Sequence, residues 1–443
     1  MRKLYLVFFL FFFIVASSYG KSLVYDSAEM DVMRFFTQKN TCYVIQNAHS
    51  FNEELTIPEG CELIFEGGRL SGKICFIQTK LKGSVDLRGS SIRGTIKNNC
   101  FNASWICHMD GETDDAPCIN EILDVCGRIY FPKGRYRLVS AFDPVGRVPK
   151  GFESKIKTHI GICRNKVSLV GEEGTVFITN KPLGVICLIS QPNQIQNSIN
   201  NVLIKKIEFK VENDGKSFYD LIHTIKIMGV NGLRIENCYF NDFWGDAICL
   251  SHYGDNPQTG ERTRNQNIKI LNNTIVGGVH YSNRNGISVI SGKNVLIKWN
   301  TIKNTSRKDM PGGIDVEPNN SAYVVENIRI EKNVLDGIKG GGGAISVVSP
   351  KGSPAHRIYI IGNTVTNSET GVFVYLKSDN STDTYYIMNN HIDYKTRPYR
   401  FEGSGVSSNW IISGNTFDRP CTQDIPGDIR VKNLVIKNNK KKE

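Results

Sequence analysis

The sequence lacks several features that would assign it to a familiar class of protein. After residue 20, no apolar run approaches the roughly 18 residues that a membrane-spanning helix needs. The chain contains 12 cysteines, but no Cys-x-x-Cys pair and no Cys/His cluster with zinc spacing. Its basic residues are dispersed and form neither an arm nor a reading helix. The sequence therefore predicts no transmembrane segment, no zinc site and no nucleic-acid partner.

Residues 1–20 are typical of a secretory signal peptide. Arg2 and Lys3 precede an apolar run from Leu4 to Val15, and small residues follow up to Gly20. We expect cleavage near Gly20 and a soluble chain that is secreted, periplasmic or at the cell surface; an uncleaved anchor is the alternative. The formal net charge of the whole chain, +11, favours polyanionic partners such as an acidic polysaccharide.

The cysteines are interpreted mainly as small apolar residues. Several lie within strand-like alternation, where a free cysteine packs like a short aliphatic side chain. Two disulfides are nevertheless compatible with the spacing, Cys100 with Cys107 and Cys118 with Cys126, and the sequence does not decide between these possibilities.

The first part of the chain, residues 21–110, is predicted to be β-rich. From Leu55 onward, short alternating strands are separated by glycine-containing turns, as in the first coils of a β-solenoid or a small capping domain. One short helix then follows Asp114 and Asp115, with Pro117 in its first turn. Because a helix begins directly after them, Asp114 and Asp115 are interpreted as capping residues and not as catalytic acids.

Two short patterns recur along residues 111–439. The first is a small or turn-forming residue followed by a strand of alternating aliphatic residues, and its copies begin at Gly245, Asn285, Gly312, Gly343 and Thr370. The second is an aliphatic strand that ends in asparagine, at Asn237, Asn273, Asn300, Asn333, Asn363, Asn390, Asn415 and Asn438. The asparagines are given a structural role, since asparagine tolerates the left-handed conformation of a sharp corner and its amide can bond to the next coil.

Coils of short strands with asparagine at one corner predict an all-β parallel β-helix for residues 111–439, followed by a basic tail at 440–443. At this point the chain resembles the secreted right-handed parallel β-helix proteins of the pectate lyase and pectin lyase-like superfamily. The stretch from Thr113 to Asn120, followed by Ile129 to Tyr136, is similar to the opening segment of its pectate-lyase-3 type members. The resemblance implies a right-handed coil, whereas the reaction stays open because that superfamily hosts several chemistries.

Two carboxylates stand out on the outward face of one strand. Asp315 and Glu317 are two residues apart, so their side chains point the same way and their Cα atoms lie about 6.5 Å apart. Aligned positions in the other copies carry serine, isoleucine, valine or phenylalanine. This separation suits a pair in which one carboxyl protonates a glycosidic oxygen and the other serves as base or nucleophile. A solvated pair of surface acids is the alternative.

Further polar residues are expected on the same face. Asp246 lies two coils before the pair, about 10 Å away, and Arg284 precedes the intervening coil. Lys226 aligns with Cys249 one coil further back, His223 aligns with Asp246, and His252 follows the strand. We therefore predict Asp315, Glu317 and Asp246 as catalytic, and Arg284, Lys226 and His252 as substrate-binding.

The segment that begins at Gly245 also partly resembles the Gly-Asp-Asp segment of polygalacturonase-like hydrolases. One aspartate, Asp246, stands where those enzymes have two, and Arg284-Asn285-Gly286 lacks the histidine of their Gly-His-Gly segment. The resemblance implies only that Asp246 lies in the cleft.

Aromatic residues accompany the acids. Trp244, Tyr253 and Tyr281 are predicted to contact sugar rings, because aromatic rings offer broad apolar contact with a polar edge. For Phe373 and Tyr375 a stacked ladder on the solenoid surface is an equal alternative.

Three functions fit these residues. The first is a secreted enzyme that hydrolyses glycosidic bonds of a polysaccharide by carboxylate acid/base catalysis, without a cofactor. The second is a uronate lyase acting by β-elimination, in which calcium bound by Asp246, Asp315 and Glu317 would neutralise the substrate carboxylate. The third is a non-catalytic β-helix that binds or adheres to glycans.

Overall fold

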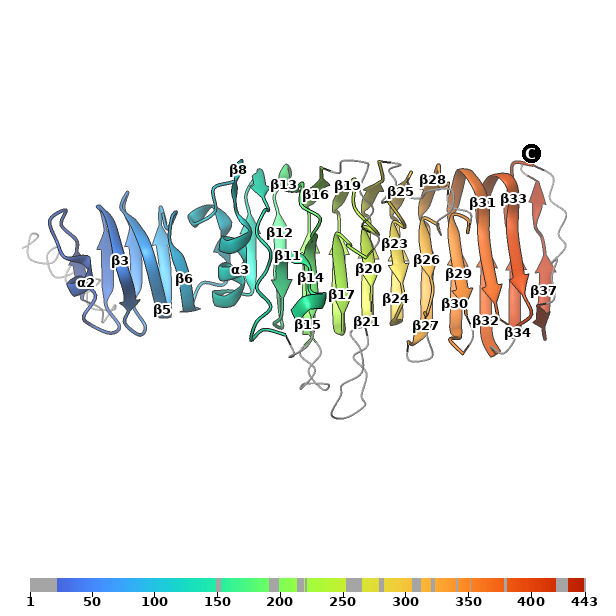
Figure 1. Cartoon of the computed structure of the whole chain (residues 1–443), viewed down its shortest axis with the longest axis horizontal. Helices are drawn as coiled ribbons and strands as arrows, with labels where there is room; N and C mark the ends of the chain where they lie inside the picture. Colours follow the sequence, from blue (N-terminus) through green and yellow to red (C-terminus); the bar gives the residue numbers. More distant parts are fainter. Residues whose placement is uncertain are drawn as a thin grey trace, which may run out of the picture. The chain divides into compact units, whose positions relative to one another are not determined.

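The computed structural model (Figure 1) describes the chain with several gaps. The described residues are 22–148, 153–190, 199–212, 219, 221–251, 265–278, 283–304, 312–319, 323–339, 342–350, 352–377, 381–419 and 429–441. The predicted signal peptide, His252, Tyr253 and Tyr281 lie outside them. Among the described residues no helix is long and apolar enough to span a membrane.

The chain divides into two compact units, residues 1–107 with 124–126, and residues 108–123 with 127–443. The described part of the first unit is built from parallel strands that pair in two sheets, one through β1, β2, β4 and β5 and the other through β3, β5 and β6. Its elements are β1 (Leu23–Tyr25), α2 (Val32–Phe35), β2 (Cys42–Ile45), β3 (Ala48–Ile57), β4 (Glu62–Phe65), β5 (Arg69–Gly83), β6 (Ser91–Ile96), β7 (Phe101–Asn102) and η1 (Ala103–Trp105).

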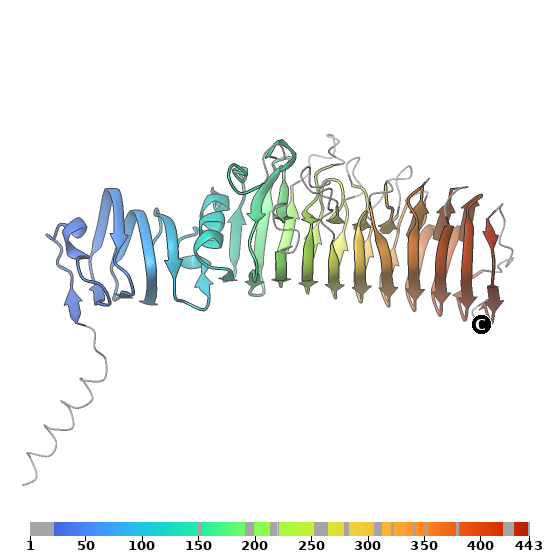
Figure 2. The same ribbon diagram turned by 90° about the horizontal axis from the view of Figure 1, so that it is seen from below.

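The second unit is a right-handed parallel β-helix, as predicted. Each coil contributes one strand to each of three faces, and every strand pairs in parallel with the equivalent strand one coil away (Figures 1 and 2). The first face contains β9 (Arg128–Phe131), β12 (Ser168–Gly171), β15 (Ile199–Lys205), β18 (Val230–Glu236), β21 (Gln266–Leu271), β24 (Gly292–Lys298), β27 (Val325–Glu331), β30 (Ala355–Ile361), β32 (Ser381–Met388), β34 (Val406–Ser413), β36 (Arg430–Val431) and β37 (Leu434–Lys437).

The second face contains β8 (Asp110–Asp114), β10 (Gly134–Arg137), β13 (Thr175–Thr179), β16 (Glu208–Val211), β19 (Tyr239–Asn241), β22 (Thr274–Val276), β25 (Thr301–Lys303), β28 (Val334–Asp336), β35 (Thr416–Phe417) and β38 (Lys440–Lys441). The third face contains β11 (Thr158–Ile162), β14 (Gly184–Ile189), β17 (Ile225–Met228), β20 (Ile248–Leu250), β23 (Ile287–Val289), β26 (Ile314–Val316) and β29 (Ile345–Ser349). Two long strands, β31 (Thr364–Leu376) and β33 (His391–Gly403), run through both of these faces.

The core of the coil is made of stacked aliphatic columns. On the third face, Ile248, Ile287, Ile314 and Ile345 are in register and completely buried. Successive side chains of a strand alternate between its two sides. The residues next to these isoleucines in each strand therefore point away from the core. The alternation of the recurrent strand therefore sets both the core and the outward column that carries the candidate site.

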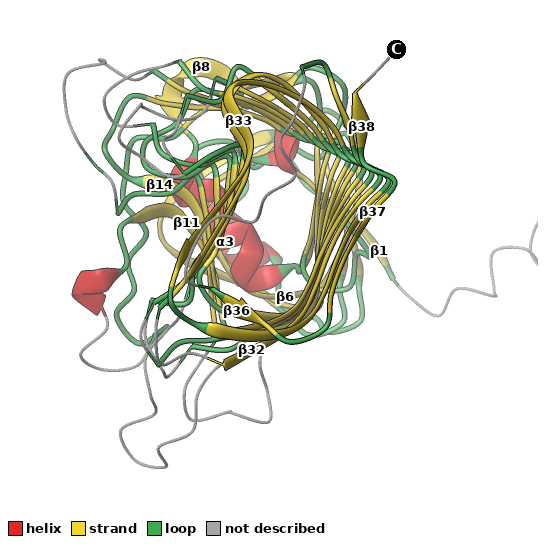
Figure 3. Cartoon of the chain, turned by 90° about the vertical axis from the view of Figure 1, so that its right-hand side faces the viewer, coloured by secondary structure: helices red, strands yellow, loops and turns green. Residues whose placement is uncertain are grey.

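One corner of the coil is held by a buried asparagine ladder. The Nδ2 atom of Asn333 donates a hydrogen bond to Oδ1 of Asn363 at 3.0 Å. The Oδ1 atom of Asn333 accepts one from Nδ2 of Asn300 at 3.0 Å. The same contact links Asn273, Asn300, Asn333, Asn363, Asn390, Asn415 and Asn439 in turn. The corner lies between β37 and β38 in Figure 3.

The backbone at this corner corrects one detail of the prediction. The left-handed residue is the one before each ladder asparagine, such as Trp299 at φ 59° and Lys332 at φ 53°. Asn438 holds this left-handed position in the last coil, and the ladder member there is Asn439. The buried asparagines are therefore selected for their amide bonds, while the turn itself tolerates several residue types.

The predicted helix is present as α3 (Ala116–Val125). The Asp114 carboxylate accepts hydrogen bonds from the backbone of Ala116, Val139 and Ser140, and that of Asp115 accepts from His108 and Met109. Asp114 therefore accepts from the first residue of α3, as its capping interpretation predicted, whereas the Asp115 side chain binds backbone donors that precede the helix.

The cysteines depart from the two candidate pairs. Cys107 and Cys118 are both disulfide-bonded. The thiol of Cys126 lies 3.9 Å from the carbonyl of Asn98, and that of Cys100 lies 3.7 Å from the carbonyl of Phe101. Cys100 and Cys126 are therefore not in disulfide bonds, and neither pairing that the sequence left open is present. Spacing along the chain does not show which cysteines the fold brings together.

Candidate active site

The candidate site lies on the outward side of the third face. Strand register aligns Lys226, Cys249, Ser288, Asp315 and Ser346 in one column across β17, β20, β23, β26 and β29. These positions point away from the aliphatic core, yet Cys249, Ser288 and Asp315 are at most 2% exposed. The predicted acid on this face is therefore buried, which excludes the alternative that Asp315 is a solvated surface group.

Asp246 precedes β20 and is held by three neighbouring groups. Its Oδ1 atom accepts a hydrogen bond from the backbone N–H of Asn285 at 3.0 Å and lies 3.9 Å from Nε of Arg284. Its Oδ2 atom lies 3.3 Å from Nδ1 of His223. Asp246 is only 2% exposed, so this carboxylate is fixed in one orientation.

The imidazole of His223 contacts Asp246 in a second way. The backbone N–H of Asp246 donates to Nδ1 of His223 at 3.2 Å, which requires that nitrogen to be unprotonated. In this arrangement the ring is neutral with its proton on Nε2. The backbone N–H and the carboxylate of Asp246 therefore both face the same ring nitrogen of His223.

Asp315 and Glu317 sit in environments that favour the protonated carboxyl. Burial raises the pKa of Asp315 well above its usual value, and the neighbouring charges of Glu317 and Asp246 raise it further. Burial also raises the pKa of Glu317, although that side chain is half-buried and keeps a path to solvent. Asp315 is therefore expected to hold a proton at neutral pH, next to a more accessible carboxyl.

Arg284 and Asn285 connect the acids of different coils. The positive charge of Arg284 lowers the pKa of both Asp315 and Glu317, which partly offsets their burial. The Asn285 amide donates to Ser288 Oγ at 3.0 Å and lies 3.5 Å from Oδ2 of Asp315. The other carboxyl oxygen of Asp315, Oδ1, is buried and has no hydrogen-bond partner among the described residues. The structure thus brings Asp246, Arg284 and Asp315 together around Asn285.

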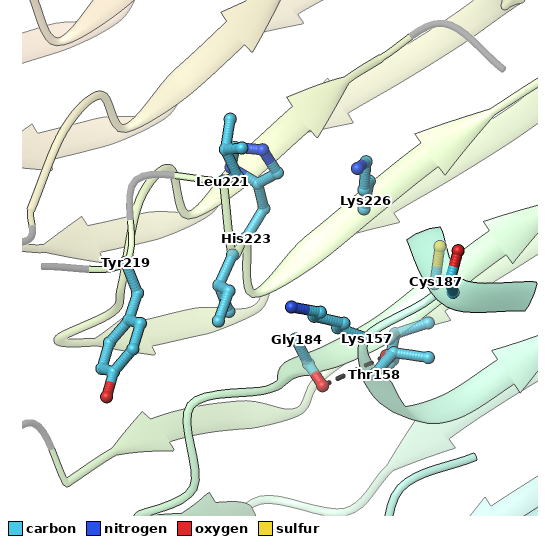
Figure 4. Close-up of a pocket in the computed structure, with 11 residues that line it drawn as sticks. Lys157, Thr158, Gly184, Cys187, Tyr219, Leu221, His223 and Lys226 are labelled. Atoms are coloured by element: carbon cyan, nitrogen blue, oxygen red, sulfur yellow. Dashed lines mark hydrogen bonds between the residues drawn. The ribbon is translucent and has the colours of Figure 1, made fainter. Parts of the chain in front are cut away.

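A cavity of about 430 Å³ lies beside this cluster (Figure 4). Its lining combines β11, β14 and β17 with the segment before β17, and the residues are Ser154, Lys157, Thr158, Gly184, Ile186, Cys187, Tyr219, Leu221, Ile222, His223 and Lys226. His223 belongs to both places, since it lines the cavity and contacts Asp246. Lys226, predicted to bind substrate, thus lies in the cavity, three strands from Asp315 in the register.

Trp244 is not placed on a surface where a sugar ring could stack. Its side chain is 4% exposed, and its ring meets that of Tyr219 edge to face at 5.8 Å. The ring therefore packs inside the protein against Tyr219, and its predicted contact with substrate is not supported. Phe373 and Tyr375, which remain half-buried, lie further along the outward side on β31.

The three acids do not form a compact calcium site. Calcium takes six to eight oxygen ligands, and carboxylates are suitable donors. Among the described residues, however, the clusters whose ligand atoms converge within 4.8 Å are His223, Asp246, Cys249 and Cys107, Asp115, Cys118; the trio Asp246, Asp315, Glu317 is not one of them. Arg284 also places a positive charge beside Asp246 already. The residues therefore do not fit a calcium ion shared by all three carboxylates.

Several site residues have only a weak signal in the sequence. Asn285 lies in the recurrent turn, where it looks like a corner residue, and its role in joining two coils depends on side-chain geometry. Lys157 and Tyr219 come from segments without the repeat, so nothing in the pattern places them near Lys226. His223 is the exception, because its alignment with Asp246 two residues before the strand already predicts their contact.

Comparison with known proteins adds a likeness of fold. No protein-family model and no curated protein matches the chain. Among solved structures, a tailspike protein of the Acinetobacter baumannii bacteriophage Fri1, a capsular polysaccharide depolymerase, is 11% identical with a TM-score of 0.46; the likeness covers 77% of this chain and 59% of that one.

Two further solved structures are similar. PfbA, a surface adhesin of Streptococcus pneumoniae, is 15% identical over 78% of this chain and 93% of that one, with a TM-score of 0.38. The catalytic unit of an α-1,3-glucanase from Streptomyces thermodiastaticus is 11% identical over 96% and 69%, with a TM-score of 0.41. These likenesses bear on the fold alone.

Proposed function

We propose that this protein is a secreted enzyme that cleaves glycosidic bonds of a polysaccharide by acid/base hydrolysis. The observation that carries the proposal is the pair Asp315 and Glu317, two carboxyls on one outward strand face whose surroundings differ. Asp315 is fully buried and Glu317 is half-buried, so the two groups hold their protons with different strength. A pair of carboxyl groups whose pKa values differ because of their surroundings is the usual basis of glycosidase chemistry.

The difference in environment supports an assignment of roles. Asp315, whose pKa is raised more strongly by burial and by two neighbouring carboxylates, holds the proton and is the general acid of this proposal. Because Asp315 is only 1% exposed, the proposal requires that substrate binding opens a path to this carboxyl. Glu317 is more accessible, and the charge of Arg284 lowers its pKa, so it serves as base or nucleophile. Asp246 lies further back, where its negative charge keeps Asp315 protonated.

The experiment that tests this proposal is product analysis with a panel of acidic and neutral polysaccharides. Hydrolysis releases reducing ends without the ultraviolet absorbance of an unsaturated uronate. Glu317→Gln should lower the rate by about 10²- to 10⁴-fold, the usual range for loss of an acid/base group. Glu402→Gln is the matched control, because Glu402 is also half-buried on the outward side, lies three strands beyond Glu317 on β33, and already pairs with Arg400. Equal activity of the two variants would contradict the assignment of Glu317.

The second candidate is β-elimination from a uronate. It is favoured by the cations near the acids, Arg284 and Lys226, of which one could neutralise a substrate carboxylate while a base removes the neighbouring proton. The product of this reaction would absorb in the ultraviolet. If a chelator abolished the activity, the enzyme would also require calcium, which the arrangement of Asp246, Asp315 and Glu317 does not suggest. Binding without any product would leave a glycan-binding or adhesive β-helix.

A further inference from the structure

We propose that the cavity between Lys157 and Lys226 is a binding subsite for an acidic sugar, one that carries a carboxylate or a sulfate. The inference deepens the proposed function, on which it rests, because it names the substrate class that the site would select. It starts from the cavity and not from the carboxyl pair, which lies three strands away.

The size and lining of the cavity suit a small polar ligand. Its volume of about 430 Å³ falls within the range of roughly 300–1,000 Å³ that is common for ligand sites. Apolar side chains such as Ile186 and Leu221 form part of the wall, and Tyr219 adds an aromatic ring. Walls of this kind contact the apolar faces of a sugar, while a few charged groups fix its orientation.

The charge of the cavity selects an anion. Lys157 and Lys226 both line it, from opposite sides of the strand β14 (Figure 4). Neither lysine forms an ion pair with an acidic residue anywhere in the described part of the chain, and none of the described lining residues is acidic. Two ammonium groups that line one concave site attract an anion more strongly than they would on an open surface.

The position of the cavity connects it with the carboxyl pair. Lys226, Cys249, Ser288 and Asp315 are register partners on consecutive strands, so the lysine lies three strand spacings, or about 14 Å, from the acid. His223 forms a shared wall, since it lines the cavity and contacts Asp246. A polysaccharide running along the axis of the coil would therefore place an acidic sugar in the cavity while another part of the chain meets Asp315 and Glu317.

The test is equilibrium binding by calorimetry, with the full mature protein and three probes: oligogalacturonate, heparin-derived sulfated oligosaccharide, and neutral dextrin oligosaccharide. The double variant Lys157→Met with Lys226→Met should weaken binding of an acidic probe at least about tenfold, since a hydrogen bond to a charged group contributes about that much. A response to oligogalacturonate identifies the carboxylate as the ligand group. Because the heparin oligosaccharide carries both carboxylates and sulfates, a response to heparin alone identifies sulfate. Binding of dextrin should be unchanged.

The matched control is Lys269→Met with Lys432→Met, which removes the same charge from exposed positions away from the cavity. An equal loss in the control would show attraction by net charge alone and would overturn the proposal. So would wild-type affinity of the cavity variant for both acidic probes, or no binding of either probe by the wild type. Because the readout is binding, a lysine-dependent affinity with no cleavage product would refute the proposed hydrolysis and leave the subsite standing.

Discussion

Replacement of Asp315 by asparagine tests whether this buried carboxyl is neutral. Asparagine has the same shape as a protonated aspartic acid and carries no charge. If burial keeps Asp315 protonated at pH 7, Asp315→Asn exchanges one neutral polar group for another, and the stability should change by less than about 1 kcal/mol. If Asp315 were instead an ionised carboxylate compensated by Arg284, breaking that buried interaction would cost about 3–5 kcal/mol.

The surroundings of Asp315 make the first outcome the expected one. Within the described part of the chain, its Oδ1 atom has no hydrogen-bond partner, and the Asn285 amide approaches Oδ2 only at 3.5 Å. An ionised carboxylate in that position would lack the donors that normally compensate a buried charge. The two negative neighbours, Glu317 and Asp246, oppose ionisation as well.

Two measurements test the protonation state of Asp315 independently. Infrared difference spectroscopy between wild type and Asp315→Asn at pH 7 should show the carbonyl band of a protonated carboxyl in the wild type alone. Thermal unfolding at pH 7 should give midpoints that agree within about 2 °C, since 1 kcal/mol shifts the midpoint of a domain of about 150–250 residues by about 2–4 °C and that of a larger one by less. Activity should nevertheless fall by about 10²- to 10⁴-fold, because asparagine cannot donate the proton. A strongly lowered midpoint together with no carbonyl band would refute the assignment of Asp315 as the acid.

Three further predictions follow from the structure. Arg284→Met removes the charge that lowers the pKa of Glu317 and Asp315, so the acidic limb of the pH–activity profile should move to higher pH, by about one unit; an unchanged profile would exclude Arg284 from the site. Asn333→Ala should destabilise the coil by about 2–4 kcal/mol, because it removes the acceptor of the Asn300 backbone N–H and the donor to the Ile297 carbonyl; calorimetry checks this, with the exposed Asn180→Ala as control. Burial raises the pKa of Asp115 to about 6 from 3.8, so the folded state retains a proton that the unfolded chain loses, and stability falls as pH rises from about 4 to about 6. Thermal midpoints of Asp115→Asn should lack this contribution, worth at most about 3 kcal/mol, and a constant difference from wild type across that range would contradict it.

Much of the fold could be predicted because the same strand pattern occurs many times along the chain. Each copy of the recurrent strand has the same alternation, and a one-residue shift would turn every aliphatic side chain out of the core. The register of Ile248, Ile287, Ile314 and Ile345 is therefore the one expected. The corner asparagines could also be predicted from their recurrence, although the residue with the left-handed backbone lies one position before each ladder asparagine.

The candidate site could be predicted only in part. The sequence placed Asp315 and Glu317 on one face and aligned His223 with Asp246, because strand period and register fix these relations. It did not indicate the burial of Trp244, which made a packed side chain look like a sugar-binding platform. Nor did it indicate the disulfide bonding of Cys107 and Cys118.

The sequence by itself determined the parallel coil and the presence of two acids on one strand, since both are properties of a local period repeated along the chain. The tertiary structure alone decided that Asp315 is buried, that Arg284 and Asn285 meet Asp246, and that Lys157 and Lys226 share a cavity. The physical reason is that the charge state of a carboxyl and the shape of a cavity depend on contacts between segments far apart in the chain. A repeating pattern carries no record of those contacts.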